Sequence, residues 1–174
     1  MTIRPIVILP DPILKTVSQP VAGVDAEVRA LFDDMLATMY DAPGIGLAAV
    51  QIGLARRLVV VDPVRDEDAP RNPMCLANPE VVWASQDLSE YEEGCLSIPE
   101  VYDKVTRPAE VRVRFLDRNG HQQEMHCSGL LATCIQHEID HTNGILFIDH
   151  LSRLKRERII RKFAKARRQE KEPA

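Results

Sequence analysis

Two histidines four residues apart form the pattern with the clearest chemistry in this sequence. The segment reads His137-Glu138-Ile139-Asp140-His141, an HExxH motif. On a helix this spacing puts both imidazoles on one face, where they can hold one metal ion. A carboxylate directly after the first histidine can then take a proton from a water that the metal activates. The motif predicts metal-dependent hydrolysis with Glu138 as the group that moves protons.

The alternative is a helix that simply carries two core or surface histidines. The residues before the motif argue against it, because Leu130, Leu131, Cys134 and Ile135 predict a buried helix. Two buried histidines without partners would be costly.

A third metal ligand has to come from elsewhere in the chain, because catalytic sites usually have three protein ligands and one open position. His150 follows His141 by nine residues, beyond a glycine turn, and does not fit. Cys95, next to Gly94, is the best donor, and a thiolate favours Fe(II) or Zn(II). Its rival role is that of a nucleophile with a histidine as base. The HExxH motif makes metal ligation the better interpretation.

A glycine-rich segment, Gly44-Ile-Gly-Leu-Ala-Ala-Val-Gln51, is the third candidate. It is not a phosphate-binding loop, because no Lys-Ser/Thr follows it. Small residues would let an extended ligand approach the backbone, and Gln51 could direct its amide at a reacting carbonyl. Taken alone, the segment is better explained as a tight turn into a strand.

Composition predicts one soluble domain. The chain has 174 residues, of which 45% are hydrophobic and 28% charged, and it has no stretch of 18 apolar residues. The N-terminus does not resemble a signal peptide, so we expect a cytosolic protein. Four cysteines without a CxxC pair predict reduced thiols, which outside Cys95 would be small buried hydrophobes.

The hydrophobic pattern predicts an α+β fold, with mostly antiparallel strands around a central metal-binding helix and a C-terminal helix outside. Pro79 makes its strand irregular or an edge strand, and Asn119-Gly120 predicts a hairpin turn. The predicted helices cover 25–41, 130–142 and 153–169, and the predicted strands cover 58–61, 74–84, 86–91, 111–115 and 122–127.

Charge is unevenly distributed. Residues 151–174 contain ten lysines and arginines against three glutamates, a net of +7, so the other residues carry −11. We expect 1–174 to be a single catalytic domain with 151–174 as a basic C-terminal helix and tail. The tail would meet an anionic partner, or it is simply the solvated face of a terminal helix.

The sequence resembles the peptide deformylase family in three motifs: GIGLAAVQ at 44–51, EGCLS at 93–97 and QHEIDH at 136–141. Their order and separation also match, and 8–14 resembles the opening segment of that family. The resemblance implies removal of the formyl group from the N-terminal formylmethionine of nascent polypeptides. It also implies one divalent metal, natively Fe(II), with zinc, nickel or cobalt able to occupy the site.

The resemblance also implies roles for individual residues. Cys95, His137 and His141 would bind the metal, Glu138 would be general base and then general acid, and Gln51 with the Leu96 N–H would stabilise the oxyanion. Tyr102 stands where many members carry arginine, which leaves the preference beyond methionine open. The peptide channel and the methionine pocket would be formed by Ile45, Gly46, Gly94, Leu130 and Cys134.

Metal ligands need neighbouring side chains that hold them in the correct orientation. We predict that Asp140 has this role and that it pairs with Arg107. Glu93 is a further candidate for the same role. The alternative for Asp140 is a charge on the protein surface, because neighbouring residues on a helix face different ways.

The resemblance implies that the basic helix docks on ribosomal RNA, where electrostatic contacts dominate. We expect a monomer in a bacterial cytoplasm, without membrane contact. Two rival functions remain: a zinc endopeptidase, which shares HExxH, and a ribosome-associated binding protein with a structural metal. The second would need a fourth protein ligand, and Cys75, Cys127 and Cys134 are not convincing.

Overall fold

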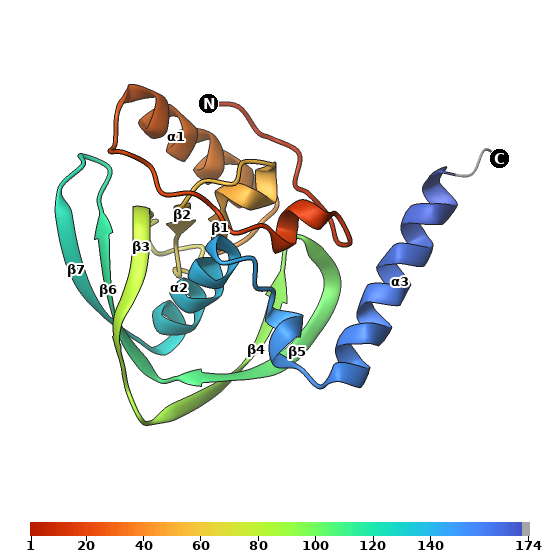
Figure 1. Ribbon diagram of the computed structural model, residues 1–174. Helices are drawn as coiled ribbons and strands as arrows, with labels where there is room; N and C mark the ends of the chain where they lie inside the picture. Colours follow the sequence, from red (N-terminus) through yellow and green to blue (C-terminus); the bar gives the residue numbers. More distant parts are fainter. Residues whose placement is uncertain (172–174) are drawn as a thin grey trace.

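Helix α2 (Gly129–Thr142), which carries the HExxH motif, lies at the centre of the fold in the computed structural model, which describes residues 1–171 (Figure 1). Two sheets surround it, and every pairing within them is antiparallel. The five-stranded sheet has the order β1 (Gly46–Ala48), β2 (Leu58–Val61), β3 (Met74–Ala84), β6 (Glu110–Leu116), β7 (Gln122–Ser128), and the two-stranded sheet pairs β4 (Leu88–Cys95) with β5 (Ile98–Pro108). The other elements are α1 (Ala26–Asp41), α3 (Arg153–Lys171) and the 3-10 helices η1 (Pro12–Lys15), η2 (Ala49–Ile52) and η3 (Phe147–His150).

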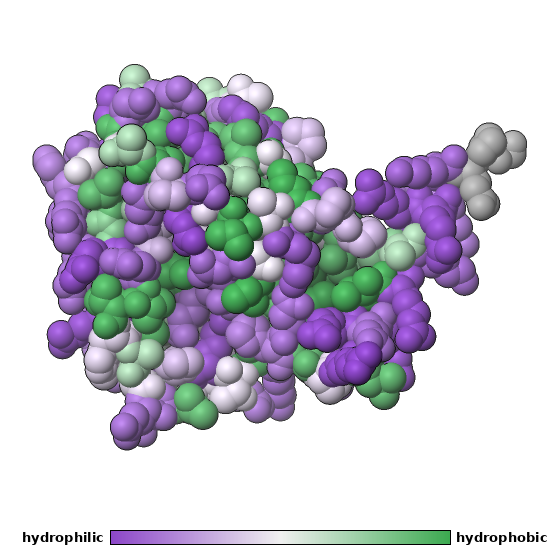
Figure 2. Space-filling view, viewed as in Figure 1, coloured by the Kyte–Doolittle hydropathy of each residue, from purple (hydrophilic) through white to green (hydrophobic). Residues whose placement is uncertain are grey.

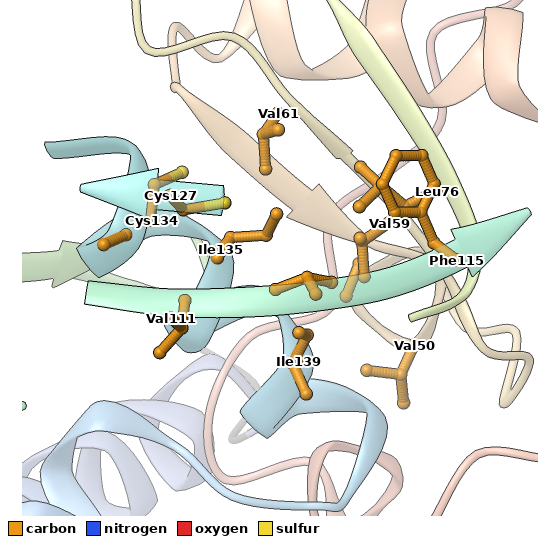
Figure 3. Close-up of a cluster of buried hydrophobic side chains, with 13 residues drawn as sticks. Val50, Val59, Val61, Leu76, Val111, Phe115, Cys127, Cys134, Ile135 and Ile139 are labelled. Carbon is orange, nitrogen blue, oxygen red and sulfur yellow. The ribbon is translucent and has the colours of Figure 1, made fainter. Parts of the chain in front are cut away.

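The five-stranded sheet is covered on both faces, and strand β2 shows why its sequence is a continuous apolar run. Leu58 and Val60 pack with α1, whereas Val59 and Val61 pack with α2 (Figure 3). Successive side chains of a strand point to opposite faces, so a strand covered on both sides has no polar position. The buried sheet gives the HExxH helix a rigid support.

Helix α1 begins after an N-cap residue, Asp25, which is the first residue of the predicted helix 25–41. The Asp25 carboxylate accepts a hydrogen bond from the Val28 N–H at 2.9 Å, which satisfies one unpaired donor of the first turn. Val28, Phe32 and Met35 then face the sheet and are buried.

We expect Asp25→Ala to lower the free energy of unfolding by about 1 kcal/mol, because it removes this cap. Urea unfolding followed by circular dichroism would measure the change. Asp87→Ala is the matched control, because the exposed Asp87 side chain makes no hydrogen bond within residues 1–171. Equal stability of the two variants would contradict the prediction.

Most predicted elements are present, but the strand pattern is corrected in two places. Strand β5 was missed, because two of its four inward positions, Asp103 and Arg107, are charged and hide the alternation. Strand β3 is irregular around Pro79, as predicted, with a positive φ of 49° at Asn78 and a shifted register. It is not an edge strand, since it lies between β2 and β6. Strand β4 also extends further, to Cys95.

Helix α3 stands outside the body, as predicted (Figures 1 and 2). None of its described side chains is fully buried, and it packs through the half-buried Ile159 and Phe163. Lys155 forms an ion pair with Asp103 of β5 at 3.1 Å. The last residues of the predicted tail, 172–174, lie outside the described residues. No helix in the described part of the chain is both long and apolar enough to cross a membrane.

Candidate metal centre

One cysteine and two histidines bring their donor atoms to a common point. The Nε2 atoms of His137 and His141 lie 3.2 Å apart, and Cys95 Sγ lies 3.5 Å from His141 Nε2. All three donors are within 4.8 Å of one another. The usual zinc bond lengths in a tetrahedron separate two nitrogens by about 3.3 Å and a nitrogen and a sulfur by about 3.5 Å. This donor set therefore fits one tetrahedral metal ion.

The ligands come from two parts of the fold. His137 and His141 lie on successive turns of α2, with their ring centroids 4.9 Å apart. Cys95 is the last residue of β4, and the strand register shifts between Gly94 and Cys95. The irregular register turns the end of the strand toward the helix, so the site depends on the docking of β4 and β5 against α2.

His137 is oriented from behind by Glu93. Its Nδ1 atom lies 2.9 Å from Glu93 Oε1, so the carboxylate holds the proton on Nδ1 and leaves the Nε2 lone pair for a metal. Arg107 donates to both oxygens of Glu93, at 2.7 and 2.9 Å. Burial alone would raise the pKa of Glu93, but the hydrogen bonds from Arg107 and His137 outweigh it and lower the pKa to about 2.

Arg107 also joins Asp140 to this group, through a hydrogen bond of 2.8 Å to Asp140 Oδ2. The structure thus brings together the three residues that the sequence suggested as a support for the metal ligands. A further side chain, His150, lies 2.8 Å from the same Asp140 oxygen. The sequence offered no reason to place His150 here, since only its unsuitability as a metal ligand could be inferred.

His141 is fully buried, and burial lowers the pKa of its imidazole, with His137 and Arg107 acting in the same direction. This shift favours the neutral imidazole, the form in which a histidine binds a metal. Its Nδ1 atom has no hydrogen-bond partner among residues 1–171.

Glu138 is almost completely buried, with 2% of its surface exposed, next to the ligands. Burial raises the pKa of Glu138 to about 7, against a smaller opposing effect of His137. A pKa near neutrality suits a group that must both take and return a proton, and a bound cation would lower it. One carboxylate oxygen lies 3.9 Å from His141 Nε2, beside the donor set rather than within it.

The amide of Gln51 is held in one orientation. Its oxygen accepts from the Ala48 N–H at 2.9 Å, and its nitrogen donates to Ser97 Oγ at 3.1 Å. The same nitrogen lies 3.5 Å from Cys95 Sγ, so an amide donor points at the sulfur of Cys95. Ser97 was missed from the sequence, although its place in the EGCLS segment was a signal.

A cleft of about 1240 Å³ opens onto these groups. Behind its wall lie His141, Arg107 and Asp140, which do not line it. The segment 63–73, between β2 and β3, contributes Arg65 and Arg71 to the lining. The cleft is lined by the predicted substrate and catalytic residues Ile45, Gly46, Gln51, Gly94, Leu96, Leu130, Cys134 and Glu138.

An HExxH helix, a cysteine at the end of a strand and a buried glutamate facing a cleft define a metal-dependent hydrolase. The family model of polypeptide deformylase matches residues 3–157. The chain belongs to the polypeptide deformylase family, whose members are metallohydrolases.

Named relatives cover nearly the whole chain. A peptide deformylase of Methylocella silvestris is 65% identical over 95% of this chain and 86% of its own length. That of Rhizobium meliloti is 58% identical over 95% of both chains. The crystal structure of peptide deformylase from Ehrlichia chaffeensis in complex with actinonin has a TM-score of 0.90 at 40% identity, covering 95% of this chain and 98% of that one.

Proposed function

We propose that this chain removes the N-terminal formyl group from the formylmethionine of nascent polypeptides and releases formate. The observation that carries the proposal is the buried Glu138 beside the convergent donors Cys95, His137 and His141, in a chain of the deformylase family. The four groups would supply a metal site and a proton carrier, and Cys95, His137 and Glu138 among them line the cleft.

Cys95, His137 and His141 would hold one divalent metal, natively Fe(II), with zinc, nickel or cobalt able to replace it. When bound, the metal supplies Lewis acidity and lowers the pKa of water toward about 7. A ligand set with one thiolate and two imidazoles suits such borderline-soft ions.

Glu138 takes the proton of the attacking water and returns it to the amine that leaves. Its burial supports this role, because the raised pKa of about 7 makes the carboxylate a stronger base toward water while it can still release the proton near neutral pH. Gln51 Nε2 and the Leu96 N–H would donate hydrogen bonds to the developing oxyanion. The fixed amide orientation of Gln51 supports that assignment, because a preorganised donor costs no reorganisation during the reaction.

The substrate backbone would bind in an extended form between β1 and Gly94 of β4. The Ile45 carbonyl accepts from the Asp62 N–H at 2.8 Å, on the β2 side. In an antiparallel strand the backbone N–H and C=O groups of successive residues point alternately toward one neighbour and the other. The N–H and C=O of Gly46 therefore point away from β2, to the free edge of β1, where a peptide can pair with them. Ile45, Leu130 and Cys134 would border the methionine side chain.

The decisive experiment measures formate release from a formyl-methionyl dipeptide, with protein purified anaerobically and loaded in turn with Fe(II), Ni(II) and Zn(II). We expect metal-dependent release that actinonin inhibits, and little activity on the acetyl-methionyl dipeptide, because the formyl carbon bears only hydrogen and fits a cramped site. Equal rates on both dipeptides would contradict the proposal. Casein digestion would instead support the zinc endopeptidase, and absence of formate with every metal would support the binding protein.

Gly46 offers a geometric test of the proton carrier. A Cβ built at this position would lie 2.6 Å from Glu138 Oε2 and 2.9 Å from its Cδ and Cγ atoms. We expect Gly46→Ala to displace the carboxylate and to lower kcat/KM by about 10²-fold, as misplacements of about 1 Å do. Gly23→Ala is the control, because its Cβ would meet nothing within 4 Å. A Gly46→Ala enzyme as active as the control would contradict this placement of Glu138.

The basic helix α3 would dock on ribosomal RNA, which supports access to nascent chains. Its charge and its position outside the body favour an electrostatic contact that weakens with salt. Truncation after residue 150 is expected to reduce co-sedimentation with ribosomes at low salt, and unchanged co-sedimentation would refute the docking. The ion pair of Lys155 with Asp103 fixes the base of the helix.

We also propose that residues 1–174 form a single catalytic domain, active as a monomer in the bacterial cytoplasm, where its nascent substrate is made. The donors Cys95, His137 and His141 already converge within this chain, which supports a site that is complete in one copy. Sedimentation equilibrium of the metal-loaded protein tests the monomer.

A further inference from the structure

The hydrogen bonds behind the metal centre continue to a histidine that the reaction itself does not use. His150 ends the 3-10 helix η3, and its Nε2 atom lies 2.8 Å from Asp140 Oδ2. Its partner is a carboxylate that also pairs with Arg107, so the shared proton is carried by His150 Nε2. The side chain of His150 is 35% exposed, at the point where the chain leaves the body for α3.

Asp140 Oδ2 is therefore held from two sides. Arg107 Nη1 donates to it at 2.8 Å from β5, and His150 donates to it at the same distance from η3. Arg107 in turn grips Glu93 with two hydrogen bonds, and Glu93 fixes the Nδ1 proton of His137. An unbroken series of hydrogen bonds thus runs from His150 to a metal ligand.

The same series joins the two parts of the fold that share the metal ligands. Glu93 and Cys95 lie on β4, whereas His137 and Asp140 lie on α2. Arg107, which is 5% exposed, bridges the two through its pairs with Glu93 and Asp140. The pairs of Arg107 with Glu93 and Asp140 therefore connect β4, which carries Cys95, to the helix that carries both histidines.

We propose that His150 is a positioning residue for the metal site, acting through Asp140 and Arg107 on Glu93 and His137. Asp140 has 20% of its side chain exposed, in contrast to 4% for Glu93, so it lies near the surface, where water can take the place of His150 once that side chain is removed. Without His150 the carboxylate exchanges a fixed donor for mobile water and turns more freely. Arg107 then loses its second anchor, and the orientation of His137 becomes less sharply defined.

The test is a measurement of metal affinity. It rests on the proposed function in one respect only, that Cys95, His137 and His141 hold the metal. Zn(II) affinity is determined by competition with a chromophoric chelator for the wild type, His150→Ala, His150→Gln and His126→Ala. His126→Ala is the matched control, because His126 also pairs with a carboxylate, Glu110 at 3.2 Å, but on the exposed β7 strand. The removal of a direct partner of a metal ligand costs about 10- to 100-fold in affinity. His150 lies three hydrogen bonds beyond Glu93, the direct partner of His137, so we expect a smaller loss of about 3- to 10-fold for His150→Ala.

The conservative variant and a double mutant separate positioning from a general structural role. Glutamine at position 150 keeps an N–H donor, so His150→Gln should regain most of the affinity. Asp140→Ala removes the oxygen that accepts from both Arg107 and His150, so His150→Ala should cause no further loss in that background. Thermal unfolding of the metal-free variants identifies any that do not fold.

Wild-type affinity in His150→Ala would overturn the proposal, as would a loss of equal size in the Asp140→Ala background. Because zinc affinity is measured without turnover, its outcome is separate from that of the formate assay. The expected affinity pattern in a protein that releases no formate would support the role of His150 and refute only the deformylase function.

Discussion

Glu138→Gln is expected to lower kcat/KM for formate release by at least about 10²-fold, because glutamine has the shape of glutamate but cannot accept the proton of the attacking water. The metal should remain, since Glu138 lies beside the donor set formed by Cys95, His137 and His141 and is not part of it. The measurement combines steady-state kinetics on a formyl-methionyl dipeptide with the metal content of the same sample.

The matched control is Glu124→Gln, an exposed glutamate of β7 outside the cleft, which should keep wild-type kinetics. If Glu138→Gln retained more than a tenth of the activity with a full metal content, another group would have to carry the proton. If the metal were lost as well, Glu138 would have to be counted among the ligands.

Arg107→Met is expected to lower the free energy of unfolding by about 3–5 kcal/mol, the usual cost of removing one partner from a buried ion pair. Arg107 and Glu93 are both 5% exposed, and methionine would leave Glu93 and Asp140 without their shared cation. Urea unfolding of the metal-free protein at pH 7 measures the change.

The same variant should change the dependence of stability on pH. The pKa of Glu93 is about 2 in the folded protein, below its ordinary value, so its contribution is present above about pH 5 and is lost as the pH falls toward 2. That contribution amounts to about 3 kcal/mol. In Arg107→Met burial keeps the pKa of Glu93 high, so the gap in stability between variant and wild type should narrow as the pH falls from 7 to 3.

Arg4→Met provides the comparison, because Arg4 also donates two hydrogen bonds to one carboxylate, that of Asp34, at 2.8 and 3.1 Å. The side chain of Arg4 is 38% exposed, so its loss should cost less than about 1 kcal/mol. Equal losses for the two arginines would show that burial does not determine the strength of the Arg107 pair. A gap that stays constant with pH would show that Glu93 does not cause the acid dependence.

The sequence by itself determined the elements whose local pattern is strong. The apolar spacing of α1 and its Asp25 cap, the alternation of β6 and the turn at Asn119-Gly120 each follow from a few neighbouring residues, and all are present. The HExxH spacing determined that His137 and His141 share a helix face, because four residues are close to one helical turn. The three short motifs were sufficient to indicate the family.

Only the tertiary structure decided how distant residues meet. The inward positions of β5 include Asp103 and Arg107, so its strand pattern becomes intelligible only when Glu93, Asp140 and Lys155 are seen to neutralise those charges. Likewise, no spacing rule places His150 on Asp140, because the path between them passes through a turn at Gly144 and the helix η3. Local sequence sets backbone conformation and hydrophobic faces, whereas ion pairs between elements depend on how those faces dock, and that docking is settled by the packing of the whole chain.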